Sequence, residues 1–169
     1  MILYEDESDF GLYSGTQDDW SPVAEQEKVG TRGKNRKRYV FGAQDAFTGA
    51  SYMRWAGRKN GDNFVRFLES LVKHLPGKRL VLILDNFGVH KCRRVRQWLE
   101  ETGAPVELVF LPTYSPWLNR IENTWRVVKR RAYHNTWHDT TGQLVRDVSL
   151  AMVQLGATIL CPSFGQGST

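Results

Sequence analysis

The sequence predicts an α/β domain in which helices flank a mixed sheet of about five strands. The apolar run at residues 80–84 shows no polar alternation, which is typical of a strand buried on both faces. Before it, short strand-like segments separated by a turn predict an antiparallel meander. After it, helical and strand patterns alternate, and this order favours a mixed sheet covered on both faces.

The first third of the chain supplies the meander. The segment MILYEDE at residues 1–7 predicts a first strand, and residues 10–13 either continue it or pair with it. Two further strands are expected at residues 38–43 and 50–55, with the turn QDAFTG between them. The polar stretch at residues 14–37 predicts a long loop, and loops of this length are usually functional or mobile.

Spacing and capping signals define the later elements. Asp62 is the predicted N-cap of the first helix, and Gly103 is well placed to end the second. The expected order is a helix at residues 62–74, the strand at 80–84, a helix at 91–102, a strand at 106–111, and helices at 117–133 and 140–155. We therefore expect one domain over residues 1–160 and a disordered tail over residues 161–169.

Size and composition bound the class of protein. A chain of 169 residues is long enough to bury a core in one domain without disulfides or metals. Cys92 and Cys161 lack metal-ligand spacing, and so few cysteines fit a reducing cytosol. No apolar run is long enough to cross a bilayer, and acids follow the opening MILY at once. These features predict a cytoplasmic protein, nucleoid-associated if bacterial, that has no membrane partner.

The charge is unevenly distributed along the chain. The net charge is +5, yet the first twenty residues are rich in aspartate and glutamate. Basic clusters follow at residues 28–38, 93–96 and 126–131. Acids gathered inside a basic protein fit a site that binds cations and acts on phosphates. Each cluster taken alone is equally consistent with a solvated face.

Asp85 is the first candidate functional residue. It ends the apolar run at residues 80–84, and a carboxylate at that position is costly to desolvate without a partner or a cation. In open α/β sheets, ligand groups gather where the strands end. The alternative is an aspartate that caps the turn leading to Asn86 and Gly88. We favour the functional interpretation.

Glu122 is the second candidate, and its helix has two distinct faces. An apolar face is marked by Leu118, Ile121, Trp125 and Val128. A polar face carries Glu122, Arg126, Lys129 and Tyr133. A carboxylate followed by cations on one ridge suits a metal-binding acid beside a phosphate backbone. Spacing alone equally allows an ordinary surface ion pair.

The first strand offers acids on both faces. Alternation puts Asp6 on the face shared by Ile2 and Tyr4, and Glu5 and Glu7 on the opposite face. Either set can supply a third acid, and the pattern does not choose between them.

Other aromatic and histidine residues are expected to be structural. Trp20 and Trp117 are expected to lie in the core, although a tryptophan can also stack on bases. His134 and His138 are spaced like a zinc pair, but no third ligand accompanies them.

Two stretches resemble a known family. DNFGVH at residues 85–90 and PTYSPWLNRIE at residues 112–122 resemble the DDE endonuclease domain of mariner-like and bacterial insertion-sequence transposases. In that family the second acid begins a D-N-x-x-x-H stretch, and the third ends a P-x-Y-S-P-x-L-N-x-I-E stretch after a gap in the mid-thirties. The opening LYEDESDF at residues 3–10 is similar to the family's first-acid strand.

The resemblance implies a ribonuclease H-like fold and a set of site residues. It assigns the catalytic and metal-binding roles to Asp6, Asp85 and Glu122, with Glu7 as the runner-up for the first acid. It implies two Mg²⁺ or Mn²⁺ ions about 4 Å apart, which clamp the entering and leaving oxygens of a phosphoryl displacement. Residues expected to support these acids are Glu7, Asn86, His90 and Asn119, although His90 fits a structural turn equally well.

The implied activity is DNA strand cleavage and strand transfer at transposon ends. The implied partners are double-stranded DNA, both transposon ends and target, and a second copy of the chain in the DNA complex. Expected phosphate contacts are Lys34, Arg36, Lys37, Arg126, Lys129 and Arg130. The family carries an N-terminal helix-turn-helix module, which we expect this chain to lack because its first residues resemble the first strand of the catalytic domain. The alternatives are a ribonuclease H-like nuclease without transfer activity, and an inactive remnant that binds DNA or a partner.

Overall fold

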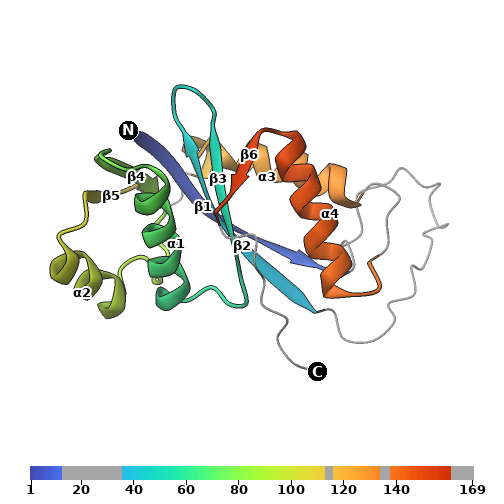
Figure 1. The fold of residues 1–169 in the computed structure, drawn as a ribbon, viewed down its shortest axis with the longest axis horizontal. Helices are drawn as coiled ribbons and strands as arrows, with labels where there is room; N and C mark the ends of the chain where they lie inside the picture. Colours follow the sequence, from blue (N-terminus) through green and yellow to red (C-terminus); the bar gives the residue numbers. More distant parts are fainter. Residues whose placement is uncertain (13–35, 113–115, 134–137, 161–169) are drawn as a thin grey trace.

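The fold is a six-stranded mixed sheet with two helices on each side, as seen in a computed structural model of the chain (Figure 1). The structure describes residues 1–12, 36–112, 116–133 and 138–160. The strands are β1 (Ile2–Gly11), β2 (Lys37–Asp45), β3 (Ser51–Ala56), β4 (Leu80–Leu84), β5 (Val106–Phe110) and β6 (Ala157–Ile159). The helices are α1 (Gly61–His74), α2 (Arg93–Thr102), α3 (Ile121–Tyr133) and α4 (Thr141–Gln154), with a 3-10 turn, η1, at Pro116–Leu118.

The strand order β5-β4-β1-β2-β3-β6 combines both expected patterns. The β1, β2 and β3 strands form an antiparallel meander, whereas β4 and β5 join β1 in parallel through helical crossovers. Strand β1 thus lies inside the sheet, between β2 and β4. Its central position allows it to bring side chains beside the end of β4.

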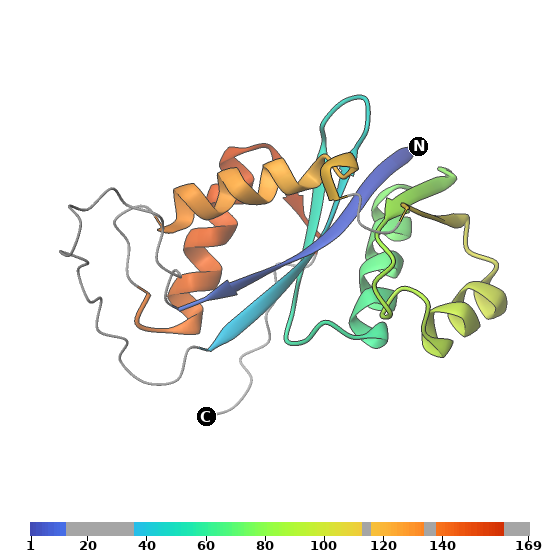
Figure 2. The same cartoon turned by 180° about the vertical axis from the view of Figure 1, so that it is seen from behind.

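A separate hydrophobic core lies on each face of the sheet, beneath a pair of helices. Helices α1 and α2 pack on one face against Leu3, Phe41 and the apolar residues of β4. Helices α3 and α4 pack on the other face against Phe10, Val40 and other residues of the meander. Figures 1 and 2 show the first pair of helices beside β4 and β5, and the second pair beyond the long strands β1 and β2. Alternate residues of β1 therefore point into different environments.

Most predicted elements are confirmed, and three details were wrong. A sixth strand, β6, pairs in parallel with β3, and its three residues are too few to show a pattern in the sequence. The N-cap of α1 is Asn60, whose side chain accepts from Asn63 N at 3.0 Å, instead of Asp62. Asp62 lies in the first turn, where it pairs with Arg94 at 3.2 Å.

The third predicted helix begins later than expected. Residues 116–118 form the 3-10 turn η1, and the α-helix starts only at Ile121. Between them, Asn119 directs its side-chain amide at the main chain of β1, 2.8 Å from the Glu5 carbonyl oxygen. This bond turns the chain toward the sheet and starts a new helix there. The expected tail at residues 161–169 lies outside the described residues.

Candidate active site

Helix α3 approaches β1 most closely beside Asp6. Asp6 is paired with Gly42 of β2, which presents no side chain to the helix above it. A Cβ atom at Gly42 would lie 2.5 Å from Trp125 Cζ2, so the glycine is required for the indole to pack there. Gln44 adds a polar tie, because its Nε2 donates to Thr124 Oγ1 at 3.0 Å. These contacts hold the start of α3 against the sheet.

Glu122 lies in the first turn of this anchored helix. The Glu122 amide donates to the Asn119 carbonyl at 3.3 Å, and the Asn119 side chain is itself bonded to Glu5 of β1. The Glu122 side chain is exposed. The buried Asn119 thus positions a solvent-accessible carboxylate next to β1.

Asp85 reaches the same part of the sheet from β4. Tyr4 of β1 pairs with Ile83 of β4, and two residues further along each strand stand Asp6 and Asp85. The Asp85 side chain is exposed, and its Oδ1 accepts from Phe87 N at 2.8 Å. Asp85 therefore caps its own turn and remains open to solvent, so the two interpretations of its sequence position are compatible.

Asn86 fixes the loop that follows Asp85. Its Nδ2 donates to the Leu111 carbonyl at 2.6 Å, which joins the ends of β4 and β5. The Lys91 ammonium group donates to Asn86 Oδ1, and it also lies 4.5 Å from the centroid of the Phe110 ring. These contacts limit the movement of the loop that carries Asp85.

The three predicted catalytic acids interact electrostatically at Asp6. Burial, with smaller contributions from the charges of Glu122 and Asp85, raises the pKa of Asp6 to about 6. The Glu7 backbone amide and the Lys59 ammonium oppose this shift. Asp6 consequently lies within range of both other carboxylates, each of which comes from a different element. The ligand atoms of these three acids do not all lie within 4.8 Å of one another in the described chain.

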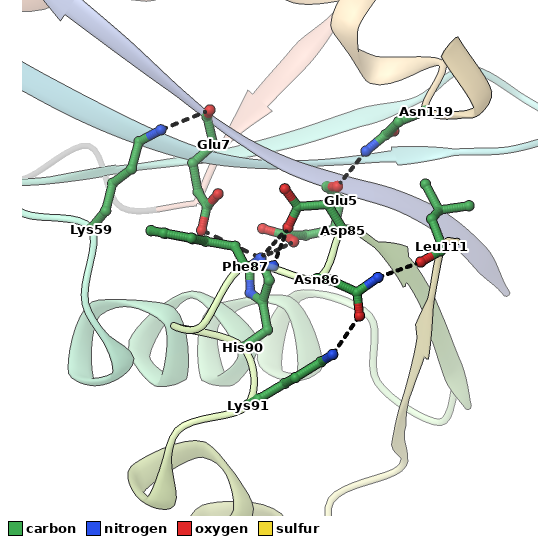
Figure 3. A network of polar contacts seen from close by, with 10 residues as sticks. All are labelled: Glu5, Glu7, Lys59, Asp85, Asn86, Phe87, His90, Lys91, Leu111 and Asn119. Carbon is green, nitrogen blue, oxygen red and sulfur yellow. Dashed lines mark hydrogen bonds and ion pairs between the residues drawn. The ribbon is translucent and has the colours of Figure 1, made fainter. Parts of the chain in front are cut away.

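A second cluster occupies the opposite face of β1. Glu5 and Glu7 point toward His90, which follows β4, and Figure 3 shows the three side chains converging with Asp85. His90 Nε2 lies 3.7 Å from Glu5 Oε2, 3.6 Å from Glu7 Oε1 and 3.4 Å from Asp85 Oδ1. Over the described ranges, Glu5, Glu7 and His90 alone form a group of three potential metal ligands with donor atoms within 4.8 Å.

Burial dominates the protonation of this cluster. Burial raises the pKa of Glu5 well above its ordinary value, with further increases from Glu7, Asp6 and Asp85. Burial also raises the pKa of Glu7 to about 8, although the Lys59 charge lowers it. The pKa of His90 falls to about 4 because burial outweighs the charge of Asp85. In the absence of a bound cation, the cluster therefore favours a neutral imidazole and protonated carboxyl groups at moderately acid pH.

The predicted phosphate-binding residues are not equally available. Arg36, Arg126 and Arg130 are exposed. Lys37 pairs with Asp9 at 2.8 Å, and the Lys129 ammonium lies 5.6 Å from the Phe10 ring centroid. Lys34 lies outside the described residues, as do Trp20, His134 and residues 113–115 of the family-like stretch.

Trp117 corrects one expectation from the sequence. It was expected in the core, but its side chain is 76% exposed. It lies in η1, five positions before Glu122, and Phe87 in the Asp85 loop is also 41% exposed. Sequence hydrophobicity cannot distinguish an exposed tryptophan from a buried one. His138 is buried beside Asp147 and the Tyr133 ring, as expected of a structural histidine.

Lys59 is a site residue that the sequence did not indicate. Its Nζ donates to the Glu7 carbonyl at 3.2 Å, and its charge lowers the pKa of both Asp6 and Glu7. A single lysine in a loop after a strand carries no motif. Only the fold brings it to the acids.

No helix in the described parts of the chain has the length and apolar character needed to cross a membrane.

Comparisons with known proteins agree with these observations. A family model described as DDE superfamily endonuclease matches residues 1–145. The insertion element IS630 uncharacterized 39 kDa protein of Shigella sonnei is 31% identical over 148 residues. That match covers 87% of this chain and 43% of the relative, so the chain spans less than half of the relative's length.

Solved structures share the fold at low sequence identity. The Mos1 mariner paired-end complex with Mn superposes with a TM-score of 0.63 at 18% identity, over 90% of this chain and 48% of that one. The HTLV-2 integrase catalytic core domain in complex with magnesium gives 0.59 at 14% identity, over 91% and 83%. These likenesses confirm the ribonuclease H-like α/β fold expected from the sequence.

Proposed function

Since this chain belongs to the DDE endonuclease superfamily, we propose that it is a transposase catalytic domain that cleaves DNA strands at transposon ends and transfers them into target DNA. The proposed catalytic acids are Asp6, Asp85 and Glu122. The observation that carries this assignment is geometric: parallel pairing of β1 with β4 aligns Asp6 with Asp85, and the bond from Asn119 to the Glu5 carbonyl holds the start of α3 against the same part of β1. Three separate elements supply the acids, and two of the three side chains are exposed to a substrate.

The donor set fits hard divalent cations. Asp6, Asp85 and Glu122 offer only carboxylate oxygens, which suit Mg²⁺ and Mn²⁺. The raised pKa of Asp6 is an observation of this chain that favours a cation, because a nearby positive charge would stabilise the ionised carboxylate. We propose two such ions, which would supply Lewis-acid activation of the attacking oxygen and stabilisation of the leaving oxygen.

The chain's own residues hold this arrangement in place. Asn119 fixes the start of α3 to β1 through the Glu5 carbonyl, and Asn86 fixes the Asp85 loop to the end of β5. Gly42 admits Trp125 and so sets the distance between α3 and the sheet. These contacts orient the acids before a substrate binds, which lowers the cost of reaching the reactive geometry.

The proposed substrate is double-stranded DNA. Arg126 and Arg130 are exposed and follow Glu122 on the same helix, where they are suited to contact phosphates. Exposed Trp117 precedes the same acid and offers a surface on which a base can stack. The Mos1 neighbour is a paired-end complex, and by analogy we propose that two copies of this chain act together on DNA in the cytoplasm or on a nucleoid.

The test is Mn²⁺-dependent nicking of supercoiled plasmid, followed by strand-transfer assays with labelled transposon-end duplexes. We expect Asp85→Asn and Glu122→Gln each to lower nicking at least about 100-fold, because each removes charge stabilisation of the transition state. Matched controls are Asp62→Asn and Glu107→Gln, which change exposed acids in surface ion pairs. Nicking that persists in both site variants, or falls equally in the controls, would contradict the assignment.

A further inference from the structure

The Glu5, Glu7 and His90 cluster is separate from the three acids assigned to catalysis above. It lies on the face of β1 that carries Leu3, whereas Asp6 lies on the face toward α3. The side chains of Glu5 and His90 are fully buried, and that of Glu7 is nearly so. Three ionisable groups in one buried place need a physical explanation.

These buried groups lack hydrogen-bond partners. Among the described residues, nothing donates to either carboxylate oxygen of Glu5 or to Glu7 Oε1, and both His90 nitrogens are also without a hydrogen bond. Lys59, the neighbouring cation, bonds to the Glu7 main-chain oxygen and not to its carboxylate. The aromatic ring of Phe64 packs edge-on to His90, with 4.6 Å between ring centroids. Burying polar groups in this way costs several kcal/mol unless something satisfies them.

The distances match those between the ligands of one metal ion. Three carboxylate oxygens surround His90 Nε2 at 3.4 to 3.7 Å. These contacts are longer than ordinary hydrogen bonds. In a tetrahedral site with ligand bonds of about 2.0–2.1 Å, neighbouring donor atoms lie roughly 3.4 Å apart. The donor atoms of Glu5, Glu7 and His90 all lie within 4.8 Å of one another, so these three side chains can converge on one ion, whereas Asp85 does not belong to that group.

We propose that Glu5, Glu7 and His90 bind one divalent transition-metal ion and leave a fourth coordination position open. An imidazole nitrogen with carboxylate oxygens suits Zn²⁺, Co²⁺ or Mn²⁺ and is a poor match for Mg²⁺, which prefers oxygen ligands alone. The ion would neutralise two buried carboxylates and occupy the unsatisfied nitrogen. Because the Asp85 side chain is exposed, the site is open to solvent on that side.

The proposed centre has a structural role. It ties Glu5 and Glu7 of β1 to His90 in the loop after β4. It differs from the proposed catalytic site in its ligands, since Asp6 and Glu122 take no part in it. Its existence does not depend on nuclease activity.

The test is titration of the metal-free full chain with Co²⁺ in excess Mg²⁺, followed by visible absorption and by the thermal unfolding midpoint. We expect one equivalent of Co²⁺ to bind with the intense bands of a four-coordinate site, and to raise the midpoint. The Asp6→Asn/Glu122→Gln double variant should retain this binding. That result separates the new centre from the proposed catalytic site.

Ligand variants supply the decisive comparison. Glu5→Gln, Glu7→Gln and His90→Gln should each weaken Co²⁺ binding at least about 100-fold, because even changes outside the ligand set weaken metal sites 10- to 100-fold. The matched control is His74→Gln, an exposed imidazole at the end of α1. Circular dichroism of the metal-free variants verifies folding, and the two isosteric Glu→Gln changes carry the test if His90→Gln fails to fold. Absence of Co²⁺ binding by the wild-type chain, undiminished binding by the Glu variants, or equal loss in His74→Gln would overturn the proposal.

Discussion

The two faces of strand β1 place neighbouring carboxylates in different surroundings. On the α3 face, Asp6 is partly buried, lies within electrostatic range of exposed Asp85 and Glu122, and has a pKa of about 6. On the α1 face, Glu5 and Glu7 are enclosed with His90, and the pKa of Glu7 rises further, to about 8. Residues adjacent in sequence thus differ in access to solvent and in the ease with which they ionise.

The alternation of side chains along β1 sends neighbouring acids to two different sites. Since alternate side chains point to opposite faces, the sequence EDE sends one acid to the open side and two to the closed side. The open side suits reaction with a substrate, whereas the closed side suits a bound ion or a shared proton. Substitutions can disturb one face of β1 at a time.

The largest effect is expected from a substitution that pushes α3 away from Asp6. Gly42→Ala would place a Cβ atom 2.5 Å from the buried Trp125 ring and so push the helix away from the sheet. We expect nicking to fall about 100-fold, as displacements near 1 Å do elsewhere, and stability to fall by about 1–3 kcal/mol. Plasmid nicking and urea unfolding measure the two effects. Gly57→Ala is the control, since its Cβ would meet nothing within 4 Å, and an equal loss there would remove the explanation.

The buried acids on the α1 face of β1 should make the stability of the protein depend on pH. The folded-state pKa of Glu7 is raised from 4.5 to about 8, so the folded protein holds a proton that the unfolded chain releases above pH 4.5. The contribution to stability is therefore fully present below pH 4.5 and is lost as pH rises toward 8, by up to about 1.4 kcal/mol per pH unit. Urea unfolding in EDTA from pH 5 to 9 measures this loss. We expect Glu7→Gln to flatten the profile and to be more stable than wild type at pH 8. A wild-type profile that rises over this range would show that the carboxyl is ionised when buried.

On the side of the proposed catalytic acids, Trp117 should stack on a base of the bound DNA. Replacing this exposed tryptophan by alanine removes about 1–3 kcal/mol of stacking per base, so DNA affinity should fall roughly tenfold. Fluorescence anisotropy with labelled end duplexes measures the affinity. Phe47→Ala, another exposed aromatic change, serves as the control. Unchanged affinity in Trp117→Ala would remove this residue from the DNA surface.

The smallest effect is expected from one phosphate contact. Arg126→Gln should reduce the slope of log affinity against log salt by about 0.9, because each neutralised phosphate releases about that share of counterions. The binding assay is repeated over a series of salt concentrations. Arg146→Gln on α4, which removes an exposed cation paired with Asp147, should leave the slope unchanged. Equal slopes for all three proteins would show that Arg126 does not contact phosphate.

Strong local patterns made much of the fold predictable. The apolar run of β4, the αL glycine at 103 and the periodic faces of α3 are local features, and each agrees with the structure. Asp85 and Glu122 stand out as candidate site residues because each follows such a pattern and belongs to a long family-like stretch. The ribonuclease H-like fold followed from the same evidence.

The remaining features depend on tertiary contacts. The order of charges in EDE cannot tell which face of β1 meets α3, because that depends on Gly42 admitting Trp125. Likewise, Lys59 is placed near the acids by a bond to the Glu7 carbonyl, and Trp117 is exposed just before Asn119 bonds to the Glu5 carbonyl. A short strand such as β6 forms because β3 offers a free edge, not because its own residues demand it.

The most direct measurement of the central claim is the metal-dependent nicking rate of Asp6→Asn beside that of Asp9→Asn. Both acids lie on β1, but Asp9 pairs with Lys37 near the surface, away from the proposed chemistry. Glu7→Gln is measured in parallel because Glu7 is the alternative first acid. We predict that Asp6→Asn lowers the rate at least about 100-fold, that Glu7→Gln lowers it less, and that Asp9→Asn stays near wild type. A wild-type rate in Asp6→Asn, or a complete loss in Glu7→Gln alone, would contradict the assignment of the open face of β1 to catalysis.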